Sequence, residues 1–298
     1  MRANTFTRLW SIGTGRFGLI VVALVALLAA VSLVWTPFDP KDVDVAARWT
    51  GPGWPHLLGT DGTGRDMLTQ LMTGARTAVF VAVGSAIIAT VIGVVLACLG
   101  SLTPRLVREG VATFIDILIA FPVLIIAMMI SSVWGGSLWV VVIAVGIGFG
   151  VNIARVTRPE LRRVLASDFV LAARASGLTP GQVVVRHLLP NVAPVFIVQL
   201  SWSMGVALLA EAGLSYLGLG ASVGEPSWGL LLSETQQYIL VHPLAVVWPG
   251  LMISISVLAL NLLGDALREA TDPTLSRRRR VPRGARNAPS QPGSTVIA

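Results

Sequence analysis

The sequence predicts an all-α integral membrane protein with six transmembrane helices. Charged residues make up only 12% of the 298 residues and hydrophobic residues 54%, whereas a soluble domain carries about 25% charged residues. The hydrophobic residues fall into long continuous runs, and basic residues flank those runs. A transmembrane β-barrel would instead require alternating segments of about ten residues. We therefore expect lipid to surround most of the chain.

Six runs are long and apolar enough to cross about 30 Å of hydrocarbon, which takes roughly 20 residues. The first follows three arginines, but its apolar core of about 19 residues is longer than that of a cleaved signal peptide. We expect it to be retained as a span. Trp134-Gly135-Gly136 predicts a tight turn between the third and fourth runs. The six runs are 17–35, 77–99, 117–133, 138–154, 192–210 and 245–263.

The basic residues predict the orientation in the membrane. With the N-terminus inside, every Lys and Arg except Lys41, Arg48, Arg65 and Arg76 falls on the cytoplasmic side, so the positive-inside rule predicts that both termini are cytoplasmic. The net charge of +7 does not indicate nucleic-acid binding, because these residues flank apolar runs. We expect a cytoplasmic N-terminus over 1–16, a six-span domain over 17–268 and a disordered basic tail over 269–298.

The first outer loop, expected over 36–75, contains a glycine-rich string. Gly59 and Gly64 allow backbone angles closed to other residues, and Asp61, Arg65 and Asp66 are expected to form a local group of ion pairs. The string lacks the Gly-Lys-Ser/Thr ending of a phosphate-binding loop. One cysteine and three scattered histidines do not make a metal site. The loop either shapes an outer gate or has only a structural role.

The cytoplasmic connection, expected over 155–190, is called the elbow below. Its first part continues the fourth span as an amphipathic helix over 158–165, and a second short helix is expected near Asp168 and ends at Gly177. Pro180-Gly181 predicts a turn, a helical pattern resumes over 182–189, and Pro190 opens the fifth span.

Small side chains in the second helix of the elbow allow another surface to approach closely. Ala172 and Ala173 are two of them, and Arg174 and Arg186 supply charge on the same segment. Two interpretations follow from the spacing. The elbow either docks onto a partner protein or lies on the lipid headgroups with its arginines touching phosphates.

The second outer loop, expected over 211–245, contains a carboxylate and an aromatic motif. Glu211 is costly if it faces lipid, so it is expected to face protein or water, in a structural role or lining the path. Trp228 and Tyr238 suit an interfacial aromatic belt. Polar residues within the spans are expected to form interhelical hydrogen bonds; they are Asn152, Gln199 and Asn261.

Several strings, taken in order, resemble those of one transporter family. They are 58–61 with 64–66, 116–122, Ala172-Ala173 with Gly177 and 189–191, 211–220, 226–229, and 261–265 with Asp272-Pro273. Over about residues 15–275 the chain resembles the inner-membrane permease subunits of peptide-importing ABC transporters. Within this dipeptide, oligopeptide and nickel group, it resembles the second, C-type permease.

The resemblance implies a type I ABC importer permease fold whose elbow is the coupling helix loop inserted into an ATPase subunit. The family pattern of E-A-A, then G, then L-P is matched here except at Leu171, which stands in place of the usual glutamate. We therefore expect the polar contacts to come from other residues of the loop. The expected coupling residues are Asp168, Leu171, Ala172, Ala173, Arg174, Gly177, Arg186, Leu189 and Pro190.

The resemblance also implies partners and a location. These are a homologous second permease, two ATP-binding subunits that hold ATP and Mg, an extracytoplasmic substrate-binding protein, and the lipid of a bacterial inner membrane. The chain itself is expected to bind no cofactor and to catalyse no reaction. The expected substrates are di- and oligopeptides; the alternatives are nickel, haem or an oligosaccharide, or a scaffold or receptor that transports nothing. The expected outer gate residues are Gly59, Asp61, Gly64, Arg65, Asp66, Glu211 and Trp228.

Overall fold

The structure, a computed structural model, describes residues 5–222 and 224–271 and is built from helices over these residues. In this part of the chain five helical stretches are long and apolar enough to cross a membrane: α2 (Gly13–Val34), α3 (Met67–Leu102), α6 (Leu138–Leu165), Pro180–Tyr216, and α11 (Pro243–Thr271). The fourth of these stretches contains α8 (Pro180–Val183), the π-helical turn η2 (Val184–Leu188) and α9 (Leu189–Tyr216). Shorter elements are α1 (Thr5–Ser11), η1 (Val45–Ala47), α7 (Asp168–Ala175), α10 (Trp228–Thr235) and η3 (Gln236–Tyr238).

The third predicted span is a broken one. It consists of α4 (Arg105–Ile119) and α5 (Val123–Trp134), which meet at a bend of 76°. The prediction of one continuous helix over 117–133 was therefore wrong. Pro122 lacks an N–H group and restricts the residue before it, so the helix ends there and a new one begins.

The predicted turn between the third and fourth spans is confirmed. Helix α5 ends at Trp134, Gly135 has φ of +85°, and α6 starts at Leu138 after the Ser137 side chain accepts a hydrogen bond from the backbone of Trp139. Only glycine adopts such a φ without strain.

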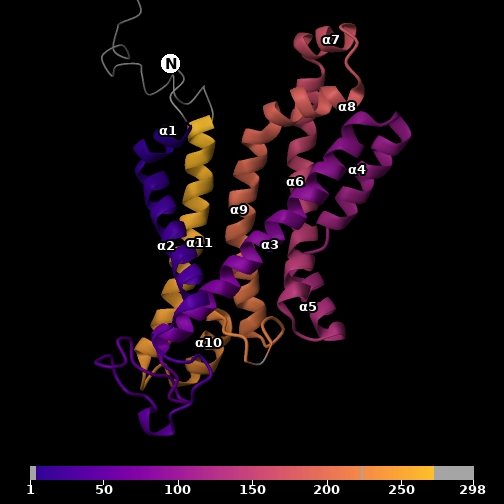
Figure 1. Cartoon of the computed structure of the whole chain (residues 1–298). Coiled ribbons are helices and arrows are strands. Elements are labelled where there is room, and N and C mark those ends of the chain that lie inside the picture. The colour runs from indigo at the N-terminus through magenta and orange to yellow at the C-terminus, as the bar shows by residue number, and fades with distance from the viewer. Residues whose placement is uncertain (1–4, 223, 272–298) are drawn as a thin grey trace, which may run out of the picture.

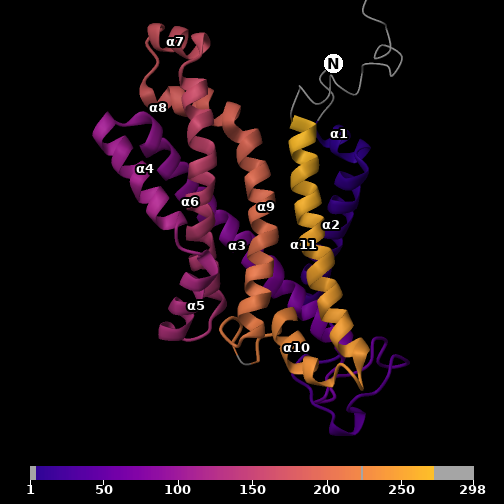
Figure 2. The ribbon, with the colours of Figure 1, turned by 180° about the vertical axis from the view of Figure 1, so that it is seen from behind.

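The long helix α3 runs obliquely through the bundle, as Figures 1 and 2 show, with α2 and α11 on one side and α4, α5 and α6 on the other. Its closest packing is against α6. A Cβ atom at Gly146 or Gly150 would lie only 2.7 Å from the Cβ atom of Ile88 or Ile92, respectively. The two helices approach closely because glycine occupies these positions, as is common between helices in membranes.

Several predicted boundaries differ from the structure. Helix α3 begins at Met67 and α9 continues to Tyr216, so the loops expected over 36–75 and 211–245 are shorter. The hydropathy pattern did not include the first turns of α3 and the last turns of α9, because these turns carry polar side chains that are buried against protein. Among them are Thr69, Gln70, Thr73, Glu211 and Ser215. Helices also occupy part of the expected N-terminal segment and extend to Thr271, whereas the rest of the basic tail and residues 1–4 lie outside the described residues.

Candidate functional site

The expected functional residues gather at opposite ends of the bundle. The elbow, with α7 and α8, forms one end, and segments 35–66 and 217–242 form the other, which we call the far end (Figure 1). In Figures 1 and 2 α7 projects beyond the ends of the long helices. Helix caps, turns and side-chain contacts determine the structure of each end.

Helix α7 ends at Ala175, and Gly177 terminates it as the sequence predicted. This glycine has φ of +85°. Its N–H donates to Arg174 O at 3.0 Å, and the N–H of Leu178 donates to Ala173 O at 3.3 Å. These two bonds form a Schellman motif, which satisfies the last carbonyls of the helix and requires a left-handed residue. The predicted role of Gly177 as a helix stop is confirmed.

The next helix, α8, starts with a capping box. The Thr179 hydroxyl accepts from Gln182 N at 3.4 Å, the Gln182 side chain accepts from Thr179 N at 2.9 Å, and Pro180 occupies the first turn. Proline suits this place because the first N–H groups of a helix have no partner within it. The prediction that Pro180-Gly181 forms a turn was therefore wrong; the pair begins a helix.

The elbow continues into α9 through a π-helical turn over Val184–Leu188. Pro190 has no N–H to return to the carbonyl four residues earlier. The side chain of Asn191 donates to the neighbouring carbonyl of His187 at 2.7 Å. The fifth span therefore opens near Pro190, as predicted, and does so without a break in the helical path.

A single hydrophobic cluster fixes the elbow to the spanning helices. Val170 of α7, Val183 of α8 and Leu188 of η2 are fully buried. They share this cluster with Leu161 of α6, Val192 of α9, and residues of α3 and α4. This close-packed cluster therefore connects α7 and α8 directly to α3, α4, α6 and α9.

The expected coupling residues are largely accessible on this rigid support. Asp168, Leu171, Ala172, Arg174, Gly177, Arg186, Leu189 and Pro190 are exposed, and Ala173 is half-buried. Leu171, at the position of the usual glutamate, is 53% exposed. It places an exposed apolar side chain on α7 beside the small side chain of Ala172.

At the far end, segment 35–66 is organised around the buried carboxylate of Asp61. One oxygen, Oδ1, accepts from Thr63 N at 2.8 Å, Thr63 Oγ1 at 2.6 Å and Arg65 N at 3.0 Å. The other, Oδ2, accepts from Arg65 Nε at 2.7 Å. Gly64 has φ of +84°, and a Cβ atom there would lie 1.8 Å from Asp44 O. The predicted Asp61–Arg65 pair is confirmed.

Asp66 does not join this ion pair, which corrects the expected three-residue group. Its Oδ2 accepts from Thr69 N and Thr69 Oγ1, each at 2.8 Å, so it caps the start of α3. Its Oδ1 lies 3.0 Å from His56 Nδ1. Gly59, with φ of +83°, lies close to the backbone of an adjoining turn. Asp66 and Gly59 thus have structural roles in this loop.

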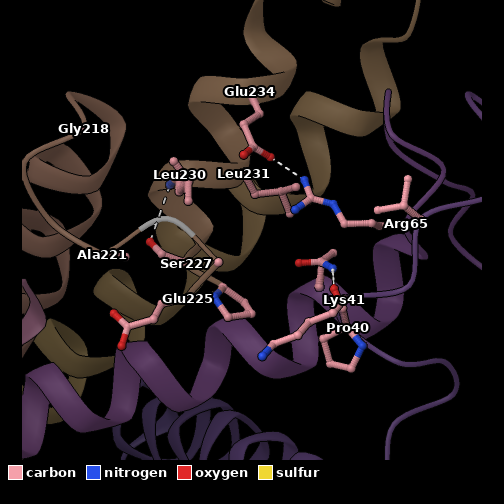
Figure 3. A pocket seen from close by; sticks show the side chains of 14 residues that line it. Pro40, Lys41, Arg65, Gly218, Ala221, Glu225, Ser227, Leu230, Leu231 and Glu234 are labelled. Carbon is pink, nitrogen blue, oxygen red and sulfur yellow. Dashed lines mark hydrogen bonds and ion pairs between the residues drawn. The ribbon is translucent and has the colours of Figure 1, made fainter.

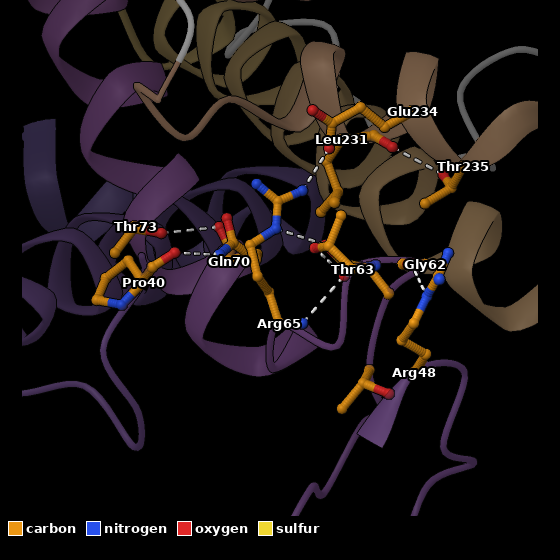
Figure 4. Close-up of polar contacts among 12 residues, drawn as sticks. Pro40, Arg48, Gly62, Thr63, Arg65, Gln70, Thr73, Leu231, Glu234 and Thr235 are labelled. Atoms are coloured by element: carbon orange, nitrogen blue, oxygen red, sulfur yellow. Dashed lines mark hydrogen bonds and ion pairs between the residues drawn. The ribbon is translucent and has the colours of Figure 1, made fainter. Parts of the chain in front are cut away.

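Arg65 also links the segment to α10, which lies far away in the sequence. Its Nη2 donates to Glu234 Oε2 at 2.5 Å (Figures 3 and 4). Burial by itself would lower the pKa of the Arg65 guanidinium, but the carboxylates of Asp61 and Glu234 outweigh it and hold that pKa above its usual value. The same segment is also linked to α3, because the Gln70 side chain donates to Pro40 O at 2.8 Å.

Trp228 anchors α10 to α3. The indole Nε1 donates to Leu71 O at 2.9 Å, and Trp228 is only 2% exposed. A Cβ atom at Gly74 would lie 2.6 Å from the indole ring. The expectation that Trp228 lies in an interfacial aromatic belt was wrong, because glycine on α3 makes room for the whole ring inside the protein. Tyr238 is partly exposed and packs on Trp49.

Glu211 is buried and joins α9 to α10. Its Oε1 accepts from Ser215 Oγ and Ser227 Oγ, each at 2.7 Å. Ser227 in turn caps α10 by accepting from Gly229 N at 3.1 Å. Ser215 accepts from Ala221 N at 2.9 Å. As expected, Glu211 faces protein, and its contacts are structural.

A hollow of about 350 Å³ lies at the far end between these anchors. Its polar lining includes Lys41, Arg65, Glu225, Ser227 and Glu234 (Figure 3). Sequence analysis missed Glu234 and Ser227. Ser227 before Trp228 is a typical helix-capping position, which was an available signal, but no local signal pairs Glu234 with a residue so distant in the chain.

A second hollow, of about 270 Å³, lies at the α4–α5 bend. It is lined mainly by apolar residues, among them Phe121 and Pro122, and by the polar side chain of Asn152. The Asn152 side chain donates to Gly148 O of its own helix at 3.0 Å. The prediction that Asn152 forms an interhelical hydrogen bond was therefore wrong. Over the described residues, Asn261 Oδ1 is buried without a hydrogen-bond partner, and the expectation for Gln199 stays a prediction.

Among residues 5–222 and 224–271, no group of three or more His, Cys, Asp or Glu side chains could hold a metal ion. The buried carboxylates of Asp61 and Asp66 are instead satisfied by hydroxyl, amide, guanidinium and imidazole groups. The elbow is held to the spans by helix caps and a hydrophobic cluster, whereas the far end is held by helix caps and buried polar contacts.

Residues 89–277 match the family model described as binding-protein-dependent transport system inner membrane component. The chain belongs to this family. It is thus a multi-pass permease subunit of an ABC importer, with ATP hydrolysis in separate subunits and a partner permease beside it. The family confirms the resemblance drawn from the sequence strings.

Curated relatives cover most of this chain. The nickel transport system permease protein NikC of Escherichia coli (strain K12) is 35% identical over 89% of this chain and 95% of its own length. The dipeptide transport system permease protein DppC of Alkalihalophilus pseudofirmus is 33% identical over 87% of this chain and 85% of its own length. A putative peptide permease protein of Brucella suis is 32% identical over 86% of each.

A solved structure confirms the fold. A chain of the MetNI methionine ABC transporter, in an inward-facing conformation, superposes with a TM-score of 0.56 at 20% sequence identity. The match covers 69% of this chain and 98% of that chain. The predicted type I importer permease fold is therefore confirmed.

Proposed function

We propose that this subunit forms half of the translocation path of an ATP-driven importer for di- and oligopeptides. In this proposal the elbow docks onto an ATP-binding subunit and passes its movement into the membrane. The single observation that carries the proposal is the construction of the elbow. Accessible residues at the tip of α7 stand on a close-packed cluster that reaches α3, α4, α6 and α9.

The elbow suits force transmission for two physical reasons. Its turns are fixed by a Schellman motif and a capping box, so few soft dihedral angles remain between α7 and the spans. Its buried valines leave little void to absorb a displacement. ATP binding and hydrolysis by two partner subunits would then move the elbow as one body and alternate access to the path.

The proposed orientation places the elbow and both termini in the cytoplasm. It rests on the distribution of arginine and lysine. The far end then faces outward, where a substrate-binding protein delivers its cargo to segments 35–66 and 217–242. A homologous permease completes the path, because one chain of this size leaves large apolar faces exposed on its spans.

The α4–α5 bend is the place where the path would approach this subunit most closely. Broken helices within a membrane occur where backbone groups face a cavity or another protein surface. The hollow at the bend supplies such a cavity. Its mainly apolar lining suits side chains of varied peptides better than a single bare ion.

Nickel is the second candidate substrate. It is favoured by the 35% identity to the nickel permease protein of Escherichia coli, whereas several relatives at 31–36% identity are named as peptide permeases. The mainly apolar hollow decides our preference for peptides.

The test is uptake by the complete transporter reconstituted with its binding protein and ATP-binding subunits in vesicles. Labelled di- to hexapeptides and radioactive nickel are supplied separately, with ATP inside. We expect ATP-dependent accumulation of peptides, competition by unlabelled peptides, and no accumulation of nickel. Accumulation of nickel alone would contradict the peptide assignment, and ATP-independent uptake of either would contradict the coupling.

A further inference from the structure

Two arginines of α6 converge on one carbonyl group near the end of α3. Arg158 Nε donates to Gly100 O at 3.0 Å, and Arg162 Nη2 donates to the same oxygen at 3.3 Å. Arg158 Nη2 also donates to the backbone carbonyl of Arg108 on α4, at 3.4 Å. The end of a helix carries a partial negative charge of about half an electron. That partial charge explains why the cations gather there but cannot balance two of them.

No carboxylate completes the balance within the described residues. Two neighbouring arginines are paired, Arg105 with Glu109 at 2.7 Å and Arg163 with Glu160 at 2.5 Å. Neither Arg158 nor Arg162 belongs to any of the ion pairs formed in residues 5–222 and 224–271. Asp116 acts electrostatically on Arg158, together with two arginines, without reaching ion-pair distance.

Most N–H donors of this arginine pair remain available. A guanidinium has five N–H groups in a planar fork, and the carbonyl contacts use only Nε and Nη2 of Arg158 and Nη2 of Arg162. Arg158 is half-buried and held by two carbonyls, and Arg162 is exposed. Two neighbouring guanidinium groups, one of them fixed, suit a tetrahedral oxyanion that accepts several hydrogen bonds.

The pair lies where apolar helix gives way to polar helix. The apolar run of the second span ends at Leu99, directly before Gly100, and that of the fourth span ends at Ala154, one turn before Arg158. The turn between α3 and α4 exposes large apolar side chains next to these charges: Leu102 is 41%, Leu106 84% and Val107 47% exposed. Helix α7 projects farther out than this turn (Figures 1 and 2).

We propose that Arg158 and Arg162 bind the phosphate of an anionic phospholipid at the junction of α3, α4 and α6. Charge complementarity selects the phosphate, and the exposed apolar residues of the α3–α4 turn enter the adjoining hydrocarbon. A lipid fits this place because the two arginines stand directly at the ends of the apolar runs of the second and fourth spans, where headgroups meet hydrocarbon. The site is separate from α7 and independent of which substrate is transported.

The test uses the purified full-length chain in detergent with phosphatidylglycerol as the added ligand and phosphatidylcholine as the uncharged comparison. Native mass spectrometry reports the lipid bound at each concentration. The variant Arg158→Gln/Arg162→Gln should bind phosphatidylglycerol at least about tenfold more weakly than wild type. The reason is that each arginine near an anionic lipid surface contributes about 1 kcal/mol of binding, and about 1.4 kcal/mol corresponds to a factor of ten. The control Arg105→Gln/Arg163→Gln removes the same charge from arginines already paired, and it should bind nearly as wild type does.

A second variant protects the test against misfolding. Arg158→Lys/Arg162→Lys keeps the charge but loses the planar fork, so it should bind with intermediate affinity at an unchanged melting temperature. Inorganic phosphate at millimolar concentration should not displace the lipid. Equal losses in both glutamine variants would contradict a specific site, as would displacement by inorganic phosphate. Unchanged lipid binding with lost association of the ATP-binding subunits would assign the surface to those subunits instead.

Discussion

At the residue scale, the far end depends on a few side chains that serve two helices at once. Glu211 holds two serine hydroxyls on one oxygen, and those hydroxyls in turn accept backbone N–H groups beyond the end of α9 and at the start of α10. Each hydroxyl therefore donates its proton to Glu211 and offers its lone pairs to the backbone. Removing the acceptor would leave two buried donors unpaired.

This geometry predicts different effects for two substitutions of Glu211. Glu211→Gln keeps a carbonyl oxygen in place and should change the free energy of unfolding by less than about 1 kcal/mol. Glu211→Leu should destabilise by about 2 to 5 kcal/mol, because the Ser215 and Ser227 hydroxyls lose their acceptor. Thermal unfolding of both variants in detergent measures the difference. Equal destabilisation by glutamine and leucine would show that charge, rather than hydrogen bonding, is what matters.

Arg65 offers a second prediction, with Arg48 as its control. Arg65→Met removes the cation between Asp61 and Glu234 and should destabilise the protein by about 1 to 3 kcal/mol, because Asp61 is buried. Arg48 donates only to the carbonyl of Gly62, at 2.6 Å, and is exposed. Arg48→Met should therefore cost under about 1 kcal/mol. Chemical denaturation of the two variants checks this; an equal cost would contradict the role of the ion pair.

The pH dependence of that link follows from the pKa of Arg65. A raised folded-state pKa gives stability that is present below the unfolded value and lost only as pH rises through the folded value. Because both values are those of an arginine, that loss lies far above neutral pH. The difference in the free energy of unfolding between wild type and Arg65→Met should thus stay constant from about pH 6 to 9. A difference that disappears within this range would contradict the assignment.

At the scale of elements, sequence reasoning worked for several local signals, although it misread the local capping box at Pro180-Gly181 and missed the helix cap at Ser227. Gly177 was recognised as a helix stop, Gly135 as part of a turn, and the α6 extension as a helix, since each depends on residues within one or two turns. Reasoning failed where burial came from distant parts of the chain. Trp228 looks like an interfacial residue until Gly74, on another helix, is seen to make space for its indole.

The elbow yields the prediction at this scale. Gly177→Val places a β-branched side chain at φ of +85°, with open space around the new atoms, so the cost is backbone strain and the Schellman turn must change. We expect normal membrane insertion but uptake reduced at least about tenfold, because roughly 1 to 2 kcal/mol of strain reshapes the docking surface. ATP hydrolysis by the complex should no longer respond to loaded binding protein.

The matched control is Gly181→Ala, whose added atom also meets open space and which stands at an ordinary helical position of α8. It should keep wild-type uptake. Wild-type uptake with normal stimulation of ATP hydrolysis in Gly177→Val would mean that the turn after α7 has no part in coupling.

At the scale of the whole molecule, composition and hydropathy were enough to predict six crossings and their order. They were not enough to find the 76° bend within the third crossing, because Ala120-Phe121-Pro122 reads as a continuation of an apolar run. Hydropathy also placed the ends of α3 and α9 too far inside, because polar residues buried against protein look like loop residues in a one-dimensional profile. Composition and hydropathy also do not show which surfaces of this chain contact other subunits.

In the proposed assembly the elbow lies beside the ATP-binding subunits. The chain has one cysteine, Cys98, so Cys98→Ser gives a background free of thiols. Ala172→Cys then adds a thiol on the exposed face of α7, and Trp54→Cys adds one at the far end, where Trp54 is 91% exposed. Both positions are exposed on this chain.

Cross-linking from position 172 in the intact transporter, with position 54 as the comparison, is the most direct measurement. We predict that Ala172→Cys cross-links to an ATP-binding subunit and reacts with a membrane-impermeant reagent only from the cytoplasmic side, whereas Trp54→Cys reacts from outside and cross-links to no ATP-binding subunit. Labelling of position 172 from outside, or its failure to cross-link to a nucleotide-hydrolysing subunit in an active complex, would contradict force transmission through the elbow.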